Sequence, residues 1–224
     1  MNIFDLIGPV MVGPSSSHTA GAVRIGLVAR KLLADEVASA DLLLHGSFAD
    51  TGRGHGTDKA LIAGLLGMEP DDTRIPESFL WAEKAGLEFR FGTISLPDAH
   101  PNSVLLRLRG RGGAEKRVVA ASVGGGRIEV RRIDDMPLRF SAEQPTLIVS
   151  NDDQPGSVAD VSRILADAGV NIGTFQVNRD ERGGRAVMVI ECDAPLDEAL
   201  VEKVRALPGI RRAVSINCET SFHN

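Results

Sequence analysis

Cysteine is scarce in this 224-residue chain, which contains two, Cys192 and Cys218. They lie far apart and outside any C-x-x-C spacing, so the chain alone cannot build a zinc ribbon or a complete iron–sulfur site. A thiolate-bound metal would have to come from another polypeptide. We expect no metal ligands in this chain and assign neither cysteine to a cluster.

Aromatic side chains and clustered positive charge are also in short supply. One tryptophan and no tyrosine leave no stacking platform for bases or sugars. The formal net charge is −5, and no stripe of lysine or arginine is interleaved with aromatics. Nucleic acid is therefore excluded as an expected partner.

Long apolar runs are missing as well. No stretch reaches the ~18 apolar residues needed to span a bilayer, and the N-terminal MNIFDLIGPVMVG has no cationic leader segment. We expect a cytoplasmic protein that has no membrane partner.

The first part of the chain mixes helical and extended patterns, with glycine and proline between them. Thr57 is expected to cap a helix that ends near Gly67. Three glycines, Gly124 to Gly126, separate two apolar runs and predict a hairpin. Predicted helices cover residues 2–8, 17–33, 57–67 and 76–84, and predicted strands cover 40–48, 86–93, 103–110, 115–123 and 126–133.

The C-terminal part has the element order β-α-β-β-α-β of a split, ferredoxin-like motif. Its first predicted helix repeats apolar residues at intervals of three and four, which indicates a face packed on a sheet. These residues are Val158, Val161, Ile164, Leu165 and Ala168. The chain is thus predicted to be α+β, with one domain over residues 1–142 and a ferredoxin-like domain over 143–224.

NDDQPG at residues 151–156 and the later AGVNI resemble the ACT domain, a small regulatory module of metabolic enzymes. Pro155 suits a first helical turn, and Gly156 lets backbone approach a ligand or a neighbour. Asp152, Asp153, Pro155 and Gly156 form the candidate regulatory loop. The alternative is that these residues only cap and turn the chain. Because ACT units usually pair, homodimerisation is expected more than ligand binding.

Four histidines of the first domain have unusual sequence neighbours: His18, His45, His55 and His100. His55 stands in GRGHGT, where small neighbours allow close approach and the following helix start offers N–H donors to an anion.

GPSSSHT supplies more hydroxyls than a helix cap requires, and the surplus suits a polar substrate. The SVGGG segment offers a third place where backbone can approach a ligand. The candidate binding residues are Ser15, Ser16, Ser17, His18, Thr19, Ser122, Gly124 and Gly125.

Other chemistries fit these motifs less well. GRGHGT matches neither nucleotide-binding glycine pattern, and no G-x-S-x-G nucleophile motif is present. A four-histidine metal site remains conceivable, although no histidine pair has the i, i+4 spacing of H-E-x-x-H.

GPSSSHT, HGSFADTGRGHGTDKA, AHPNSV and SVGGGRI, followed by the ACT-like part, resemble the β subunit of iron–sulfur-dependent bacterial L-serine dehydratase. The resemblance covers essentially the whole chain. It implies an α subunit that carries a 4Fe–4S cluster, L-serine as substrate, and an N-terminal fold similar to the allosteric substrate-binding domain of some D-3-phosphoglycerate dehydrogenases. A dehydrogenase itself is excluded because no dinucleotide-binding unit is present.

The resemblance also implies a mechanism. A cluster iron of the α subunit would act as a Lewis acid on the substrate hydroxyl, His55 would remove the α-proton, and Thr57 would orient the substrate or the imidazole. The candidate binding residues would hold the carboxylate and amino group, and paired ACT units suggest an α₂β₂ assembly. The rival hypothesis is a non-catalytic subunit that senses an amino acid or anion.

Overall fold

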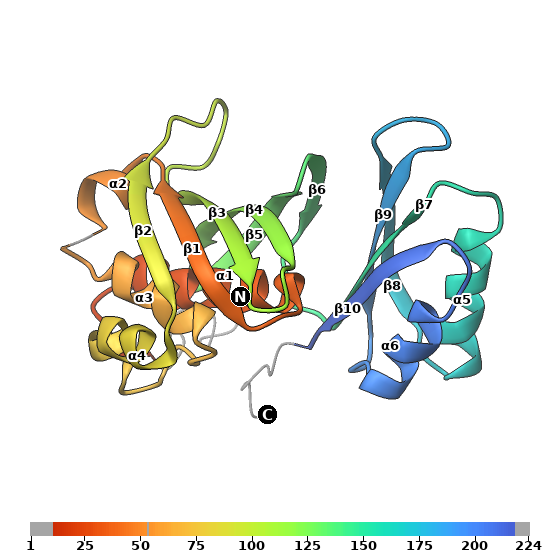
Figure 1. The fold of residues 1–224 in the computed structure, drawn as a ribbon, viewed down its shortest axis with the longest axis horizontal. Coiled ribbons are helices and arrows are strands. Elements are labelled where there is room, and N and C mark those ends of the chain that lie inside the picture. The colour runs from red at the N-terminus through yellow and green to blue at the C-terminus, as the bar shows by residue number, and fades with distance from the viewer. Residues whose placement is uncertain (1–10, 53, 218–224) are drawn as a thin grey trace, which may run out of the picture. The chain divides into compact units, whose positions relative to one another are not determined.

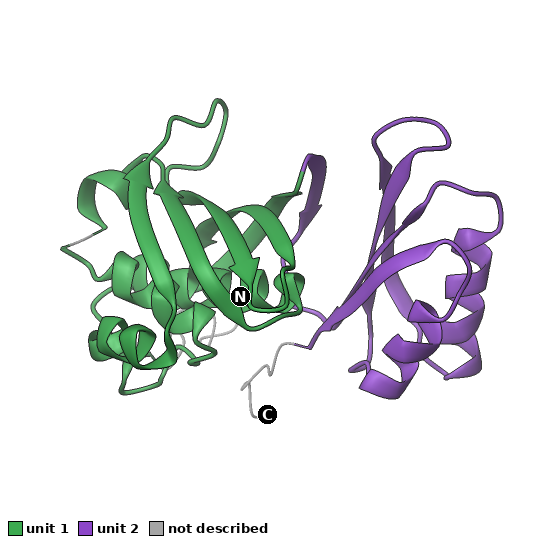
Figure 2. Ribbon diagram, in the orientation of Figure 1, with its two compact units in different colours: residues 1–134 green, residues 135–224 purple. Residues whose placement is uncertain are grey.

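The computed structural model describes residues 11–52 and 54–217. The chain divides into two compact units between Asp134 and Asp135 (Figure 2), earlier than the predicted boundary after residue 142. The predicted helix over residues 2–8 and Cys218 lie outside the described residues. No helix in the described part is long and apolar enough to cross a membrane.

The larger sheet has six strands in the order β2-β1-β3-β4-β5-β6 (Figure 1). Strand β1 is parallel to β2, while the pairs β1–β3, β3–β4 and β4–β5 are antiparallel. Gly124, Gly125 and Gly126 all have positive φ, and they turn β4 into β5 as predicted. The strands are β1 (Val37–Leu44), β2 (Glu88–Thr93), β3 (Ser103–Gly110), β4 (Glu115–Gly124), β5 (Arg127–Ile133) and β6 (Met136–Phe140).

Helices α1, α3 and α4 lie together on one face of this sheet, where α1 packs against β4 (Figure 1). A short π-helix, η2, leads directly into α1, and a 3₁₀ turn, η3, leads into α4. The helical elements are η2 (Ser16–Ala20), α1 (Gly21–Leu33), α2 (Ser47–Thr51), α3 (Thr57–Leu65), η3 (Ile75–Glu77) and α4 (Ser78–Ala85).

Two glycines let α1 and α3 meet backbone to backbone. A Cβ placed on Gly64 would lie 2.1 Å from the carbonyl oxygen of Val23 and 2.8 Å from the Cα of Gly26. A Cβ on Gly26 would lie 2.5 Å from the carbonyl oxygen of Leu61. The first turns of α1 and α3 follow the GPSSSHT and GRGHGT segments, so this contact fixes the spacing of the two motifs.

The second unit has a four-stranded sheet in the order β10-β7-β9-β8, with α5 and α6 covering one face (Figure 1). The predicted β-α-β-β-α-β order is confirmed. Val161 and Leu165 of α5 are fully buried against Met188 and Ile190 of the sheet. The elements are β7 (Thr146–Asp152), α5 (Ser157–Asp167), β8 (Ile172–Arg179), β9 (Arg185–Cys192), α6 (Glu198–Arg205) and β10 (Ile210–Ile216).

Several sequence predictions differ from the structure in detail. The strand predicted over residues 40–48 is β1, which ends at Leu44, and the next residues form α2. Thr57 is the first residue of α3, because Gly56, with φ of 71°, takes the cap position.

Two details of the first helix of the second unit were also wrong. Pro155 precedes α5, which begins at Ser157 after Gly156. Val158 is 43% exposed, and Ala168 is exposed and follows the last helical residue, so neither shares the buried face of that helix.

Candidate active site

The GPSSSHT segment is a helix start in which one serine performs the capping. The Oγ of Ser15 accepts a hydrogen bond of 3.2 Å from the backbone N–H of His18. Ser16 and Ser17 are half-buried in the first turn of η2. Thr19 is buried against Gly13, and its hydroxyl donates to the carbonyl of His55 at 3.4 Å. The two histidine motifs are therefore joined by a direct hydrogen bond.

His18 is held at both ring nitrogens. Its Nδ1 lies 3.5 Å from the Oγ of Ser15, and its Nε2 lies 3.3 Å from the Oγ of Ser47 and 3.2 Å from the Oγ1 of Thr51. The edge of the ring meets the buried Phe48 at a centroid distance of 5.4 Å. The imidazole consequently has a single defined orientation.

His55 lies beside His18, with the two ring centroids 5.0 Å apart. The side chain of His55 is exposed, and its Nδ1 lies 3.2 Å from the carbonyl oxygen of Thr51. The turn that carries it is closed by the backbone N–H of Thr57, which donates to the carbonyl of Gly52 at 2.8 Å. The structure thus brings together the two motifs that the sequence analysis singled out.

The environment of His18 favours its neutral form. Burial lowers the pKa of His18 below its ordinary value of 6.5, and the neighbouring His55 lowers it further. Hydrogen bonding at Ser47 opposes these two effects in part. The neutral form of His18 avoids the repulsion between two adjacent imidazolium rings.

Thr57 and Ser122 are less accessible than the sequence suggested. Both are fully buried, and within the described residues neither hydroxyl has a hydrogen-bond partner. The Oγ of Ser122 lies against the Cα of Gly21, where a Cβ would approach it to 2.1 Å. Buried hydroxyls of this kind cost stability, which makes them unusual in a folded protein.

The glycine hairpin after Ser122 is tied to α1. A guanidinium nitrogen of Arg24 donates to the carbonyl of Gly126 at 3.1 Å. Open space surrounds Gly124 and Gly125, since a Cβ on either would meet nothing within 4 Å. The hairpin backbone is therefore open to a neighbouring molecule.

His45 and His100 serve the loops around α2. The Nδ1 of His45 accepts from the backbone N–H of Leu96 at 3.3 Å, and that of His100 accepts from Asn102 at 3.1 Å. The turn at Gly46 packs tightly on Pro101, because a Cβ on Gly46 would lie 2.7 Å from the Pro101 oxygen. The structure thus gives these two histidines hydrogen bonds to loop backbone.

Sequence reasoning missed Ser47 and Thr51, the α2 residues that hold His18. Their spacing of four residues in SFADT places both hydroxyls on one side of a helical turn. Ser47 falls in the run predicted as a strand over residues 40–48 and Thr51 in the glycine-rich segment after it, so the sequence pattern did not indicate a helical turn here.

The predicted regulatory loop of the second unit is held by ion pairs. Asp152 accepts from Arg211 at 2.6 Å, and Asp153 accepts from Arg179 at 3.1 Å. Hydrogen bonding to the backbone N–H of Gly183, followed by Arg179, lowers the pKa of Asp153. Both carboxylates therefore have structural partners, while the N–H groups at the start of α5 follow Gly156, whose φ is 97°.

Metal ligands are sparse in the described part of the chain, where no group of three His, Cys, Asp or Glu side chains could hold an ion. Burial raises the pKa of the Cys192 thiol to about 11, which disfavours the thiolate that a metal would need. The described residues therefore do not fit an iron–sulfur cluster.

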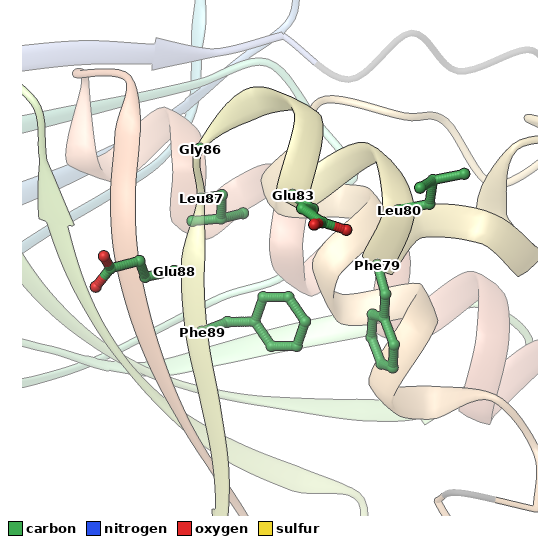
Figure 3. A pocket seen from close by; sticks show the side chains of 7 residues that line it. All are labelled: Phe79, Leu80, Glu83, Gly86, Leu87, Glu88 and Phe89. Atoms are coloured by element: carbon green, nitrogen blue, oxygen red, sulfur yellow. The ribbon is translucent and has the colours of Figure 1, made fainter.

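A shallow hollow lies between α4 and β2, where Phe79 and Phe89 face each other (Figure 3). None of the predicted site residues lines it. The candidate active site is instead the exposed surface around His55, next to His18.

Comparison with known proteins gives matches to both units. Residues 2–85 match the family described as serine dehydratase beta chain, and residues 145–209 match the ACT domain. The probable L-serine dehydratase beta chain of Bacillus subtilis is 39% identical over 96% of this chain and 97% of its own length. The L-serine dehydratase beta chain of Peptoniphilus asaccharolyticus is 40% identical over 93% of each chain. D-3-phosphoglycerate dehydrogenase of Methanocaldococcus jannaschii is 27% identical over 50% of this chain and 21% of that protein.

Proposed function

Because this chain belongs to the family of L-serine dehydratase beta chains, we propose that His55 supplies the base with which the enzyme deaminates L-serine. The enzyme is an L-serine ammonia-lyase made of two kinds of subunit, and this chain is its β subunit. The observation that carries the assignment of the base is the exposed imidazole of His55 beside the orienting cluster of His18, Ser47 and Thr51.

The reaction has a demanding proton step. The α-hydrogen of serine leaves as a proton, its bonding electrons form the Cα=Cβ double bond, and the β-hydroxyl departs as hydroxide. The aminoacrylate product tautomerises to an imine, which water hydrolyses to pyruvate and ammonia. A neutral imidazole titrates near physiological pH and is suited to accept the α-proton.

Two features of the environment of His55 support this role. The side chain is exposed, and the neighbouring Gly54 and Gly56 have no side chains that would hinder a substrate. The lowered pKa of His18 keeps that ring neutral, so the proton taken up by His55 adds only one positive charge to the pair. Thr57 acts as a positioning residue, since its amide closes the turn that carries His55.

Binding of the substrate carboxylate and amino group is assigned to the GPSSSHT segment and the glycine hairpin. Ser16 and Ser17 are half-buried and are not needed as the helix cap, which Ser15 provides. The open space around Gly124 and Gly125 allows a substrate to approach this backbone without steric hindrance. Ser15, His18 and Thr19 contribute by holding these segments in place through their hydrogen bonds, and Ser122 packs against Gly21.

The deciding experiment compares His55→Ala with Lys59→Ala, each reconstituted with the α chain and assayed for pyruvate formation. Loss of a general base lowers the rate by about 10²- to 10⁴-fold, so His55→Ala should lose most turnover while still assembling. Lys59 is exposed on the same helix start, and its variant should retain turnover. Near-normal activity of assembled His55→Ala would remove His55 from the mechanism. Full activity of the α chain alone would make this chain a regulator.

A 4Fe–4S cluster is assigned to the α chain. The name beta chain in its relatives implies such a partner, and the described residues of this chain offer no set of ligands for a cluster. The contribution of this chain is therefore acid–base and binding chemistry at the surface that the α chain approaches.

The second unit is proposed to pair with the same unit of another copy, which would give an α₂β₂ enzyme. Strand β8 lies at the edge of its sheet, and its Val177 is 46% exposed. An uncovered valine on an edge strand favours pairing. The loop of Asp152, Asp153, Pro155 and Gly156 is proposed to be regulatory, with backbone N–H groups at the start of α5 available to an anionic amino-acid effector.

A further inference from the structure

We infer that Thr51 is a positioning residue that sets the proton positions of both histidines, so that His18 carries its proton on Nε2 and His55 carries its proton on Nδ1. The importance of these proton positions for the reaction rests on the proposed function. Its geometry stands on the hydrogen-bond contacts that join α2, Ser15 and the two histidines.

The hydroxyl of Thr51 already donates its proton to a backbone carbonyl. Its Oγ1 lies 2.9 Å from the carbonyl oxygen of Ser47, one helical turn earlier, and a carbonyl oxygen can only accept. Toward the Nε2 of His18, at 3.2 Å, Oγ1 must therefore present a lone pair. A bare Nε2 would face that lone pair with its own, so Nε2 carries the proton.

The other contacts of His18 agree with this assignment. The Oγ of Ser15 accepts from the backbone N–H of His18, and its own proton is free to bond the bare Nδ1 at 3.5 Å. The Oγ of Ser47, at 3.3 Å, provides a second acceptor for the Nε2 proton. Both nitrogens of His18 are thus occupied, and the ring has no free lone pair for a substrate.

The backbone of the same residue fixes His55. The carbonyl oxygen of Thr51 lies 3.2 Å from the Nδ1 of His55, and only a protonated Nδ1 can bond to it. In the neutral ring the lone pair then resides on Nε2, which has no hydrogen-bond partner within the described part of the chain. The base is therefore the Nε2 atom of His55 and no nitrogen of His18.

One residue thereby couples the two rings. When His55 takes a proton, its Nδ1–H bond to the Thr51 carbonyl becomes charge-assisted and shorter. The Thr51 side chain meanwhile holds the neutral His18 in the tautomer that leaves both of its nitrogens engaged. Thr51 separates the roles of two histidines that are otherwise similar in chemistry and only 5.0 Å apart.

The test is an NMR measurement on the full chain labelled with ¹⁵N-histidine, at about pH 8, above the ordinary histidine pKa of about 6.5. His18→Gln and His55→Gln spectra assign the two rings. We expect His18 to be protonated at Nε2 and His55 at Nδ1, which their ring nitrogen shifts distinguish. The opposite tautomer in either ring would overturn the inference.

Two matched variants add a kinetic readout in the reconstituted enzyme. Thr51→Val keeps the shape and the carbonyl but removes the hydroxyl, whereas Thr51→Ser keeps the hydroxyl. With one neutral hydrogen bond lost, Thr51→Val should give a mixture of His18 tautomers and a fall in kcat of about 2- to 10-fold, while Thr51→Ser should restore the single tautomer and most of the rate. Loss of kcat in both variants with unchanged tautomers would show a merely structural role.

The two failures are distinguishable. If His55→Ala retains turnover while the tautomers are as assigned, the proposed function fails and the inference about Thr51 stands. If His55→Ala is inactive but His18 proves to be protonated at Nδ1, the proposed base stands and the inference fails.

Discussion

Replacing Gly64 with alanine should destabilise the first unit, although alanine is the better helix former. In an unconstrained helix this change stabilises by about 0.5–1 kcal/mol. Here the new Cβ would lie 2.1 Å from the Val23 oxygen and 2.8 Å from both the Gly26 Cα and the Leu27 nitrogen. All three are backbone atoms, so relief requires α1 to shift away from α3.

The size of the effect follows from these opposing contributions. Overpacking of a closed contact costs about 1–3 kcal/mol, and the upper part of that range applies because no side chain can rotate away. After subtraction of the helix-propensity gain, Gly64→Ala should lower the free energy of unfolding by about 1–2 kcal/mol. For a chain of this length that corresponds to a fall in Tm of about 2–8 °C.

Fluorescence of the single tryptophan offers a selective assay. Trp81 lies on α4, so urea unfolding followed at this residue reports on the first unit. Lys31→Ala, at an exposed position of α1, is the matched control and should change the unfolding free energy by less than about 0.5 kcal/mol. If Gly64→Ala proved more stable than the unmodified chain, the backbone contact between α1 and α3 would be refuted.

Two further predictions concern His18 and the second unit. The pKa of His18 is lowered in the folded chain, so the unfolded state binds its proton first, and stability should fall as pH drops below about 6.5. Urea unfolding of His18→Gln should show a shallower loss between about pH 7 and 5, and an unchanged slope would contradict the assignment. Sedimentation of the full chain should show a dimer that Val177→Asp dissociates. A monomeric unmodified chain, or a dimer lost only in Val158→Asp, would contradict pairing through β8.

The sequence predicted the strands and the long helices well because their patterns are local. SVLLRLRG is found as β3 over the predicted residues, and the ferredoxin-like order follows from the alternation of apolar runs and turns. Strand β6 is absent from the predicted strands. It contains Pro137, which is unusual within a sheet but tolerated at an edge, where β6 lies.

The site was predictable in its motifs and unpredictable in its contacts. The histidines of GPSSSHT and GRGHGT are recognisable from their neighbours, but their 5.0 Å separation depends on the crossing of α1 with α3, two helices that are distant from each other in the sequence. Helix α2 has five residues and begins after a glycine with no side-chain cap, so no periodicity marks it. For that reason the sequence does not indicate that the hydroxyls of Ser47 and Thr51 lie on one side of a helix.

The backbone contact between Gly26 and Gly64 also has a consequence for the loss of enzyme activity on heating. His18 and His55 precede different helices, and their alignment depends on the register of those helices as well as on the hydrogen bonds between the two motifs. A slight loosening at the crossing would separate the imidazoles long before either helix melts. Heat inactivation of the reconstituted enzyme should therefore begin at a lower temperature than the loss of its secondary structure, and efforts to raise its working temperature should strengthen this crossing first.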